Sequence, residues 1–230
     1  MKIAVLSSHT PSLFWFRVDM MKSFLAHGHE VYALGNEAES DWKDKFSELG
    51  IIYGTAVLLE EVGKVIKEGG TGVTVSSQSG HRMPALGAEI DEQLATTPTE
   101  ELLDLEVVQP QNIRDTLHAY QLAKRCNVKR VMYESVRWGE RKARINSISP
   151  GIIVTPLAID EFNGPRGDFY KNMFAKCPAR RPGTADEVAS LAELMLDSRG
   201  AFITGSDFLI DGGATASFFY GPLKPQQKRI

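Results

Sequence analysis

The chain has little of several features that would assign a protein to a class at once. Only two cysteines, Cys126 and Cys177, occur in 230 residues, so a disulfide framework is excluded and a reducing cytoplasm is the expected compartment. No apolar stretch is long enough to span a bilayer, and residues 1–6 are too few for a signal peptide. The formal net charge of −3 gives no reason to expect nucleic acid or an anionic membrane as a partner. The five histidines lack metal-ligand spacing, so no metal site is expected.

The opening of the chain has no glycine before Gly28. Residues 7–14 follow the first expected strand, and each of them carries a side chain. A dinucleotide-binding sheet needs glycines in this turn, because the backbone must approach the pyrophosphate closely at the helix N-terminus. Pro11 also lacks an N–H group. If a dinucleotide binds, we therefore expect its binding to be weak.

What is present is typical of one soluble α/β domain. The hydrophobic content of 43% and the charged content of 24% are ordinary for a globular protein. Apolar patterns predict strands at residues 2–7, 30–34 and 51–53, with helices at 14–27 and 41–49 between them. This alternation predicts a Rossmann-like, doubly wound α/β fold, in which a mostly parallel sheet is flanked by helices.

A helix expected over residues 117–139 carries the most informative pair of side chains. Asp115 or Thr116 can cap it, and Tyr120 and Lys124 lie one turn apart on one face. An ammonium group beside a phenol favours the phenolate and lowers the tyrosine pKa from about 10, which suits proton transfer during hydride chemistry. The alternative interpretation is an aromatic side chain at a helix edge beside a solvated lysine. Tyr220 and Lys224 have the same spacing, although Gly221 and Pro222 between them cannot continue an α-helix, so the spacing alone is a weak signal.

The surrounding motifs favour the chemical interpretation. A β-rich run, Val73–Gly80, precedes the helix, and Arg144–Pro156 follows it as a second buried strand that enters a Pro-Gly turn. Near the end come Ile203-Thr204-Gly205 and Ile210-Asp211-Gly212-Gly213. In this order the motifs resemble the short-chain dehydrogenase/reductase family over about residues 54–223. The resemblance implies an oxidoreductase that uses NAD or NADP to interconvert a small alcohol and a ketone by hydride transfer.

The resemblance also implies roles for individual residues. Tyr120 is the expected acid/base, and Lys124 lowers its pKa and holds the nicotinamide ribose hydroxyls. Ser77 is expected to bind the substrate oxygen, with Ser79 as the alternative. The turn at Pro150 and Gly151, followed by Thr155 at the carboxamide, completes the expected cofactor contacts. Three further residues have plainer expectations: Asn146 is structural, and His81 and Arg82 either face a substrate or are ordinary loop residues.

The first 53 residues depart from this family. The Thr-Gly-x-x-x-Gly-x-Gly loop and the Asn-Asn-Ala-Gly run of short-chain dehydrogenases are both absent. Residues 1–16 and Gly28-His29-Glu30-Val31 instead resemble the N-terminus of two-domain glycosyltransferases of the family-4 type. The chain therefore resembles a join near Gly54 within one α/β domain. Three functions stay open: an oxidoreductase, a non-catalytic relative that binds no dinucleotide, and a glycosyltransferase fragment.

An insertion at about residues 84–116 separates Ser77 from Tyr120. Residues 97–100 have the pattern of a capping box, so the insertion is expected to be structured. It is expected to overhang the substrate pocket as a lid or to form a subunit contact. Helices 57–68 and 117–139 correspond to those through which the family associates, so a homodimer or homotetramer is expected. Residues 224–230 are expected to form a loose tail.

Overall fold

The structure is a computed structural model that describes residues 2–7, 18–35 and 47–225. It confirms the Rossmann-like α/β class. Its strands are parallel and form a pair, β1–β2, and a three-stranded sheet in the order β3–β4–β5. The strand bounds are β1 Lys2–Ser7, β2 Glu30–Gly35, β3 Thr71–Val75, β4 Arg144–Pro150 and β5 Asp207–Ile210.

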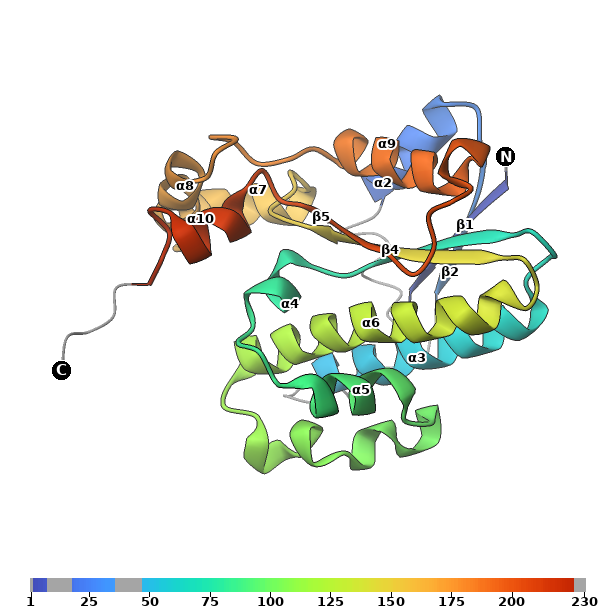
Figure 1. Cartoon of the computed structure of the whole chain (residues 1–230). Helices are drawn as coiled ribbons and strands as arrows, with labels where there is room; N and C mark the ends of the chain where they lie inside the picture. Colours follow the sequence, from blue (N-terminus) through green and yellow to red (C-terminus); the bar gives the residue numbers. More distant parts are fainter. Residues whose placement is uncertain (1, 8–17, 36–46, 226–230) are drawn as a thin grey trace.

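Helices cover both faces of the three-stranded sheet (Figure 1). On one face α2 (Val18–Ala26) and α9 (Ala185–Leu196) enclose a core around Phe24 and Ile148. On the other face α3 (Ser47–Val65) and α6 (Thr116–Gly139) pack with β4 through Val131, Trp138 and Ile145. Beyond the carboxyl ends of β4 and β5 lie α7 (Pro156–Asn163), α8 (Gly167–Lys176) and α10 (Ala214–Tyr220).

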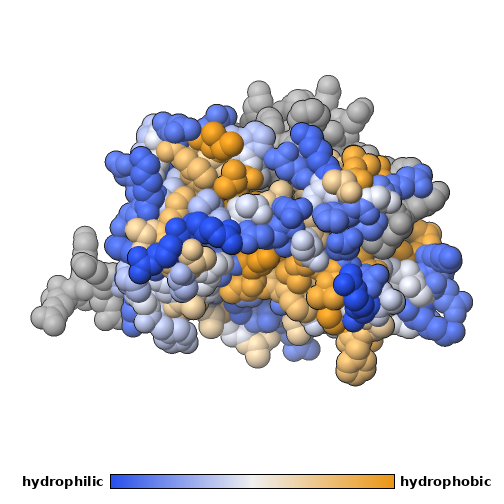
Figure 2. All heavy atoms as spheres, turned by 90° about the horizontal axis from the view of Figure 1, so that it is seen from above, coloured by the Kyte–Doolittle hydropathy of each residue, from blue (hydrophilic) through white to orange (hydrophobic). Residues whose placement is uncertain are grey.

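The face seen from above Figure 1 has a mixed surface. Hydrophilic residues alternate there with separate hydrophobic patches, and no continuous apolar band crosses the coloured area (Figure 2). Exposed apolar side chains such as Leu25 and Leu194 lie on α2 and α9, whose inner sides fill the core. These two helices therefore bury one apolar side in the core and also expose some apolar side chains on their outer sides.

Local sequence signals explain several features of these elements, and the predictions for Asp115 and Asn146 are confirmed. Asp115 caps α6 by accepting a hydrogen bond from the backbone N–H of His118. Thr184 and Glu187 form the capping box of α9. Gly28 and Gly69 have φ values of 79° and 72°, which suit glycine at chain reversals after a helix. Asn146 is structural, because its side chain donates to Ile203 and accepts from Ser206.

Two local predictions are wrong. Residues 51–53 are not a strand but belong to α3, because a run of three apolar residues fits either structure and here the helix continues through it. The capping box expected at residues 97–100 does not form. Thr97 instead ends α5, where its backbone N–H donates to the Gln93 carbonyl oxygen, and the next short helix starts after Pro98. The hydroxyl of Thr99 donates to Glu60 at 2.8 Å and accepts from Arg130 at 3.1 Å. The predicted segments 14–17 and 41–46 lie outside the described residues.

The insertion is structured, but the lid interpretation is wrong. It consists of α5 (Ala88–Thr96) and the short helices η2 (Thr99–Asp104), η3 (Glu106–Val108) and η4 (Pro110–Asn112). Its core side chains, including Leu94 and Leu102, pack on Leu122 and Cys126 of α6. Leu122 is two positions after Tyr120, and Cys126 is two positions after Lys124. Two positions correspond to about 200° of rotation around the helix. The insertion therefore covers the back of α6, away from the face that carries the expected site.

Candidate active site

The serine-bearing turn follows β3 directly. Ser77 is the N-cap of α4 (Gln78–Arg82), and its hydroxyl oxygen accepts a 3.1 Å hydrogen bond from the N–H of Ser79. The neighbouring Ser76 hydroxyl donates to the Lys124 carbonyl oxygen of α6 at 2.7 Å. A Cβ atom at Gly80 would lie 2.8 Å from the Arg125 backbone nitrogen, so α4 rests against the backbone of α6. These contacts fix Ser77 relative to the helix that carries Tyr120 and Lys124.

The tyrosine and lysine lie close together, as their spacing predicts. The Lys124 Nζ atom is 5.4 Å from the centroid of the Tyr120 ring, within the range of a cation–π interaction. Lys124 is 7% exposed, whereas Tyr120 is half-buried. Of the two side chains, the phenol is therefore the more accessible.

The remaining predicted residues lie at the end of β4. The Gly151 N–H donates to the Ile210 carbonyl oxygen at 2.9 Å, and a Cβ atom at Gly151 would lie 2.7 Å from the Asp211 Cα atom. A side chain at position 151 would therefore separate the end of β4 from the segment after β5. Thr155 caps α7 by accepting from the Ala158 N–H at 3.1 Å, and its hydroxyl hydrogen remains available to donate.

The topology brings these groups to one edge of the sheet. β3 and β4 are parallel neighbours, so Ser77 and the Pro150-Gly151 turn both follow the carboxyl ends of adjacent strands. Ligands of open α/β sheets bind outside the carboxyl ends of the strands. Docking of α4 on α6 brings Tyr120 and Lys124 to the serine-bearing turn. The serine-bearing turn and the Tyr120–Lys124 pair thus lie together, and Pro150, Gly151 and Thr155 follow the neighbouring strand.

A partly buried hydrogen-bond network around Asp207 lies beside the serine turn and has no sequence motif. The Nε2 atom of His81 lies 2.6 Å from the Asp207 carboxylate, which also accepts hydrogen bonds from Ser147 and Ser149. Burial raises the pKa of Asp207, but the hydrogen bonds from these three partners outweigh it and hold the pKa below its ordinary value. The network anchors α4 to β4 and β5. Sequence reasoning missed it because Asp207 lies 126 positions from His81.

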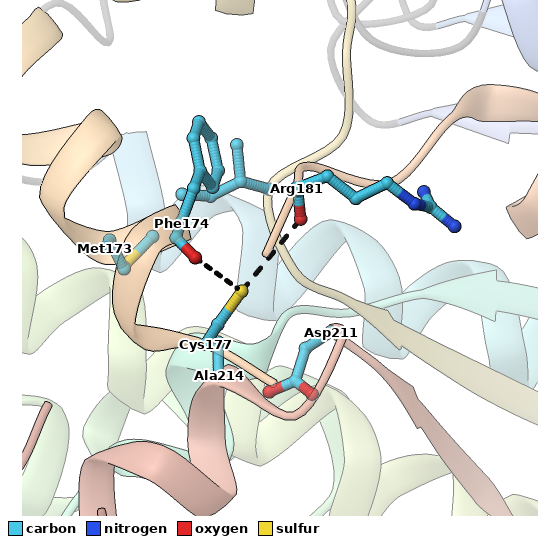
Figure 3. A pocket seen from close by; sticks show the side chains of 7 residues that line it. Met173, Phe174, Cys177, Arg181, Asp211 and Ala214 are labelled. Carbon is cyan, nitrogen blue, oxygen red and sulfur yellow. Dashed lines mark hydrogen bonds between the residues drawn. The ribbon is translucent and has the colours of Figure 1, made fainter. Parts of the chain in front are cut away.

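A small hollow lies between α8 and the start of α10 (Figure 3). The Cys177 thiol at its edge is directed at the carbonyl oxygens of Phe174 and Arg181, and the Arg181 guanidinium points away to pair with Glu187. Cys126, in contrast, lies in the core under the insertion, and burial raises the pKa of its thiol to about 12. Neither cysteine is in a disulfide.

The described residues fit one end of a dinucleotide. Tyr120, Lys124 and Thr155 offer a phenol, an ammonium and a hydroxyl of the kind that the nicotinamide ribose and carboxamide require. The glycine-free turn expected to meet the pyrophosphate lies outside the described residues. Within the described ranges there is no cluster of metal-ligating side chains, and no helix there is both long and apolar enough to cross a membrane.

Similar proteins share this combination of fold and motifs. A family model described as enoyl-(acyl carrier protein) reductase matches residues 93–215, more than half of the chain. A short-chain dehydrogenase/reductase, bsc3, from Alternaria brassicicola is 34% identical over 189 residues, which cover 82% of this chain and 68% of the relative. A D-threitol dehydrogenase from Mycolicibacterium smegmatis is 38% identical over 81 residues, covering 35% and 30% of the two chains. The fold resembles that of a 3-alpha-hydroxysteroid dehydrogenase from Pseudomonas sp. B-0831 complexed with NADH, with a TM-score of 0.61, 20% identity and coverage of 98% and 100%.

Proposed function

The chain belongs to the short-chain dehydrogenase/reductase family, and we propose that it is an NAD(P)-dependent oxidoreductase that interconverts a small alcohol and a ketone. The observation that carries the proposal is the docking of the Ser76-Ser77 turn on α6 at Lys124, one turn from Tyr120. This places a hydroxyl, a phenol and an ammonium at one sheet edge. Such a set can bind a carbonyl oxygen and move a proton to it.

In the proposed reaction the side chains divide the work. The Ser77 hydroxyl donates a hydrogen bond to the substrate oxygen and orients it. The Tyr120 phenol transfers a proton to that oxygen in reduction and removes it in oxidation. The Lys124 ammonium favours the phenolate and binds ribose hydroxyls, and Thr155 donates to the carboxamide. Bound NAD(P)H would supply the hydride.

Ser77 and Ser79 form a matched pair for testing this function. Reduction of a panel of small ketones is followed with NADH and with NADPH for the wild type, Ser77→Ala and Ser79→Ala. We expect Ser77→Ala to lower kcat about 100-fold, since an oriented hydrogen-bond donor is worth roughly 2.7 to 4 kcal/mol in a transition state. Ser79→Ala retains its activity because Ser79 contributes only its backbone N–H to the turn. Equal loss in both variants would contradict the role given to Ser77.

We further propose that the cofactor binds weakly. Side chains at every position of residues 7–14 restrict the approach of a pyrophosphate, although Ser8, Thr10 and Ser12 offer hydroxyls. Isothermal titration with NADH and NADPH is expected to give dissociation constants at least tenfold, or about 1.4 kcal/mol, weaker than in a family member with the glycine loop. A low-micromolar value would contradict weak binding. Absence of any binding would favour a non-catalytic relative instead.

We also propose a cellular compartment and a set of partners for the enzyme. Two free, buried thiols suit a reducing cytoplasm. The proposed partners are a small-molecule substrate and further copies of the chain, with no role for nucleic acid or a membrane.

A further inference from the structure

Arg82 closes the short helix α4 that Ser77 begins, and its guanidinium lies between three elements. Its Nη2 atom donates a 2.6 Å hydrogen bond to the amide oxygen of Gln78. Its Nη1 atom is 4.0 Å from the sulfur of Met173 on α8, and its Cζ atom is 5.5 Å from the ring centroid of Phe218 on α10. The guanidinium is therefore held in one orientation at the carboxyl end of the sheet.

This cation has no carboxylate partner among the residues that the structure describes. Asp211 is the acidic group that acts on it through space, without an ion-pair contact between the two side chains. The two Asp211 oxygens accept instead from the N–H groups of Gly213 and Thr215, at 2.9 and 2.6 Å. Four other arginines pair with carboxylates: Arg125 with Asp91, Arg137 with Glu134, Arg181 with Glu187 and Arg199 with Asp197. Arg130 and Arg144 also lack an ion pair among the described residues, but each donates to backbone carbonyl oxygens, whereas Arg82 donates to one side-chain amide.

Burial without a counter-ion is costly for a charged side chain. Arg82 is half-buried, but its Nε atom is buried and has no hydrogen-bond partner among the described residues, and desolvation lowers the pKa of the guanidinium. An arginine remains charged even so, since its ordinary pKa exceeds 12. The amide oxygen of Gln78 carries no net charge, so its hydrogen bond offsets little of the desolvation cost of Arg82. Arg82, on the short helix that Ser77 begins, is thus a cation without a paired carboxylate among the described residues.

We propose that Arg82 binds the carboxylate of the substrate and makes the enzyme selective for a short-chain oxo acid or the corresponding hydroxy acid. This inference rests on the proposed oxidoreductase function. A planar guanidinium matches a carboxylate through paired hydrogen bonds. Five residues of helix correspond to a rise of about 7.5 Å between Ser77 and Arg82. In the proposed complex a ketone bound at Ser77 and Tyr120 carries its carboxylate a few carbon atoms away, against Arg82.

The competing explanation is mechanical: Arg82 clamps α4 to α8 and α10 and binds no ligand. Matched substrates separate the two explanations. Pyruvate, 3-oxobutanoate and 4-oxopentanoate are each compared with their methyl esters, which retain the ketone and lose the charge. The wild type, Arg82→Met, Arg82→Lys and Phe218→Leu are assayed. Phe218→Leu removes the ring beneath the guanidinium but keeps the cation.

For at least one chain length, the wild type is expected to reduce the acid with a higher kcat/KM than the ester. In Arg82→Met this preference falls by about 10- to 100-fold, the range expected for a lost charge-assisted pair, while the ester rate stays within about threefold. Arg82→Lys restores part of the preference, and Phe218→Leu retains it. Equal losses for acid and ester, or a wild-type preference for every ester, would overturn the proposal.

A binding measurement keeps the inference testable if the chain turns over neither substrate. Saturation transfer from the protein to 4-oxopentanoate is recorded by NMR for the wild type, Arg82→Met and Phe218→Leu. A signal that is lost in Arg82→Met and kept in Phe218→Leu supports the carboxylate site although the proposed reaction has failed. No signal in the wild type, or an equal signal in all three proteins, overturns it. Should Arg82→Met fail to fold, Arg82→Lys takes its place, with a weakened signal expected.

Discussion

The Ser76 hydroxyl donates a 2.7 Å hydrogen bond to the Lys124 carbonyl oxygen, joining two residues that are 48 positions apart. This bond ties the turn after β3 to the middle of α6. The turn also presents Ser77, and α6 presents Tyr120, so one buried contact sets the relative position of both groups. The large insertion between them does not disturb this arrangement because it packs on the opposite side of α6.

Substitution of Gly80 should disturb the site through this contact. In Gly80→Ala the new Cβ atom would lie 2.8 Å from the Arg125 backbone nitrogen, which cannot move without bending α6. We expect a loss of roughly 1–3 kcal/mol in the free energy of unfolding, as for other overpacked sites, together with reduced turnover. Gly139→Ala is the control, since nothing lies within 4 Å of a Cβ atom there. Chemical denaturation measures the free energy of unfolding of both variants. A Gly80→Ala variant as stable as the wild type would mean that α4 is not held against α6.

The Asp207 network should make stability depend on pH. Its carboxyl has a lowered pKa in the fold, so it stabilises the fold above the unfolded value of about 3.9. That contribution is lost as the pH falls through the folded pKa. Asp207→Asn should therefore be less stable than the wild type at neutral pH, by roughly 1–3 kcal/mol, with the difference shrinking below about pH 4.

Asp168→Asn is the control for this pH series, because the Asp168 side chain is fully exposed. Its stability should follow the wild type throughout. Unfolding midpoints in denaturant, measured at several acidic and neutral pH values, make the comparison. A constant difference between Asp207→Asn and the wild type at every pH would show that the carboxylate charge does not contribute.

Local sequence patterns predict the helices and strands of this chain better than they predict contacts between residues far apart in the sequence. The α6 helix, its Asp115 cap and the Tyr120–Lys124 pair follow from residues close in sequence, and each is present as expected. Residues 51–53 were ambiguous, because a short apolar run has no period that distinguishes a strand from a helix. The lid prediction failed because the sequence between Ser77 and Tyr120 does not reveal which side of α6 it covers. The helical positions of Leu122 and Cys126 settle that question only once their partners are known.

The groups around the site were even less predictable. Arg82 and His81 are adjacent, yet one meets Met173 and Phe218 and the other meets Asp207. All three partners lie at least 91 positions further along the chain, so no local pattern relates them. Thr97 likewise does not form its expected capping box with Glu100 but ends α5, where its carbonyl oxygen accepts from Arg130, a partner 33 positions away. Tertiary hydrogen bonds here override a favourable local motif.

Association should depend on the exposed outer side of α6. Met132 and Val136 are one turn apart and 51% and 72% exposed, in a part of α6 that the insertion leaves uncovered. We expect a homodimer or homotetramer that buries them, so the double substitution Met132→Lys and Val136→Lys should yield monomers, since buried unpaired ammonium groups are costly. Leu25→Lys on α2 is the control. Light scattering at micromolar concentration tests this, and a monomeric wild type would contradict it.

The most direct test of the account is the turnover of Tyr120→Phe beside that of Tyr133→Phe. Both substitutions remove one phenol oxygen from α6, and only Tyr120 lies beside Lys124. Ketone reduction with NADH and NADPH is measured after circular dichroism has shown that both variants are folded. The account predicts that Tyr120→Phe loses at least about 100-fold in kcat, as expected for a missing general acid, while Tyr133→Phe keeps the wild-type rate. A Tyr120→Phe variant that keeps most of its turnover would contradict the proposed role of Tyr120 in catalysis.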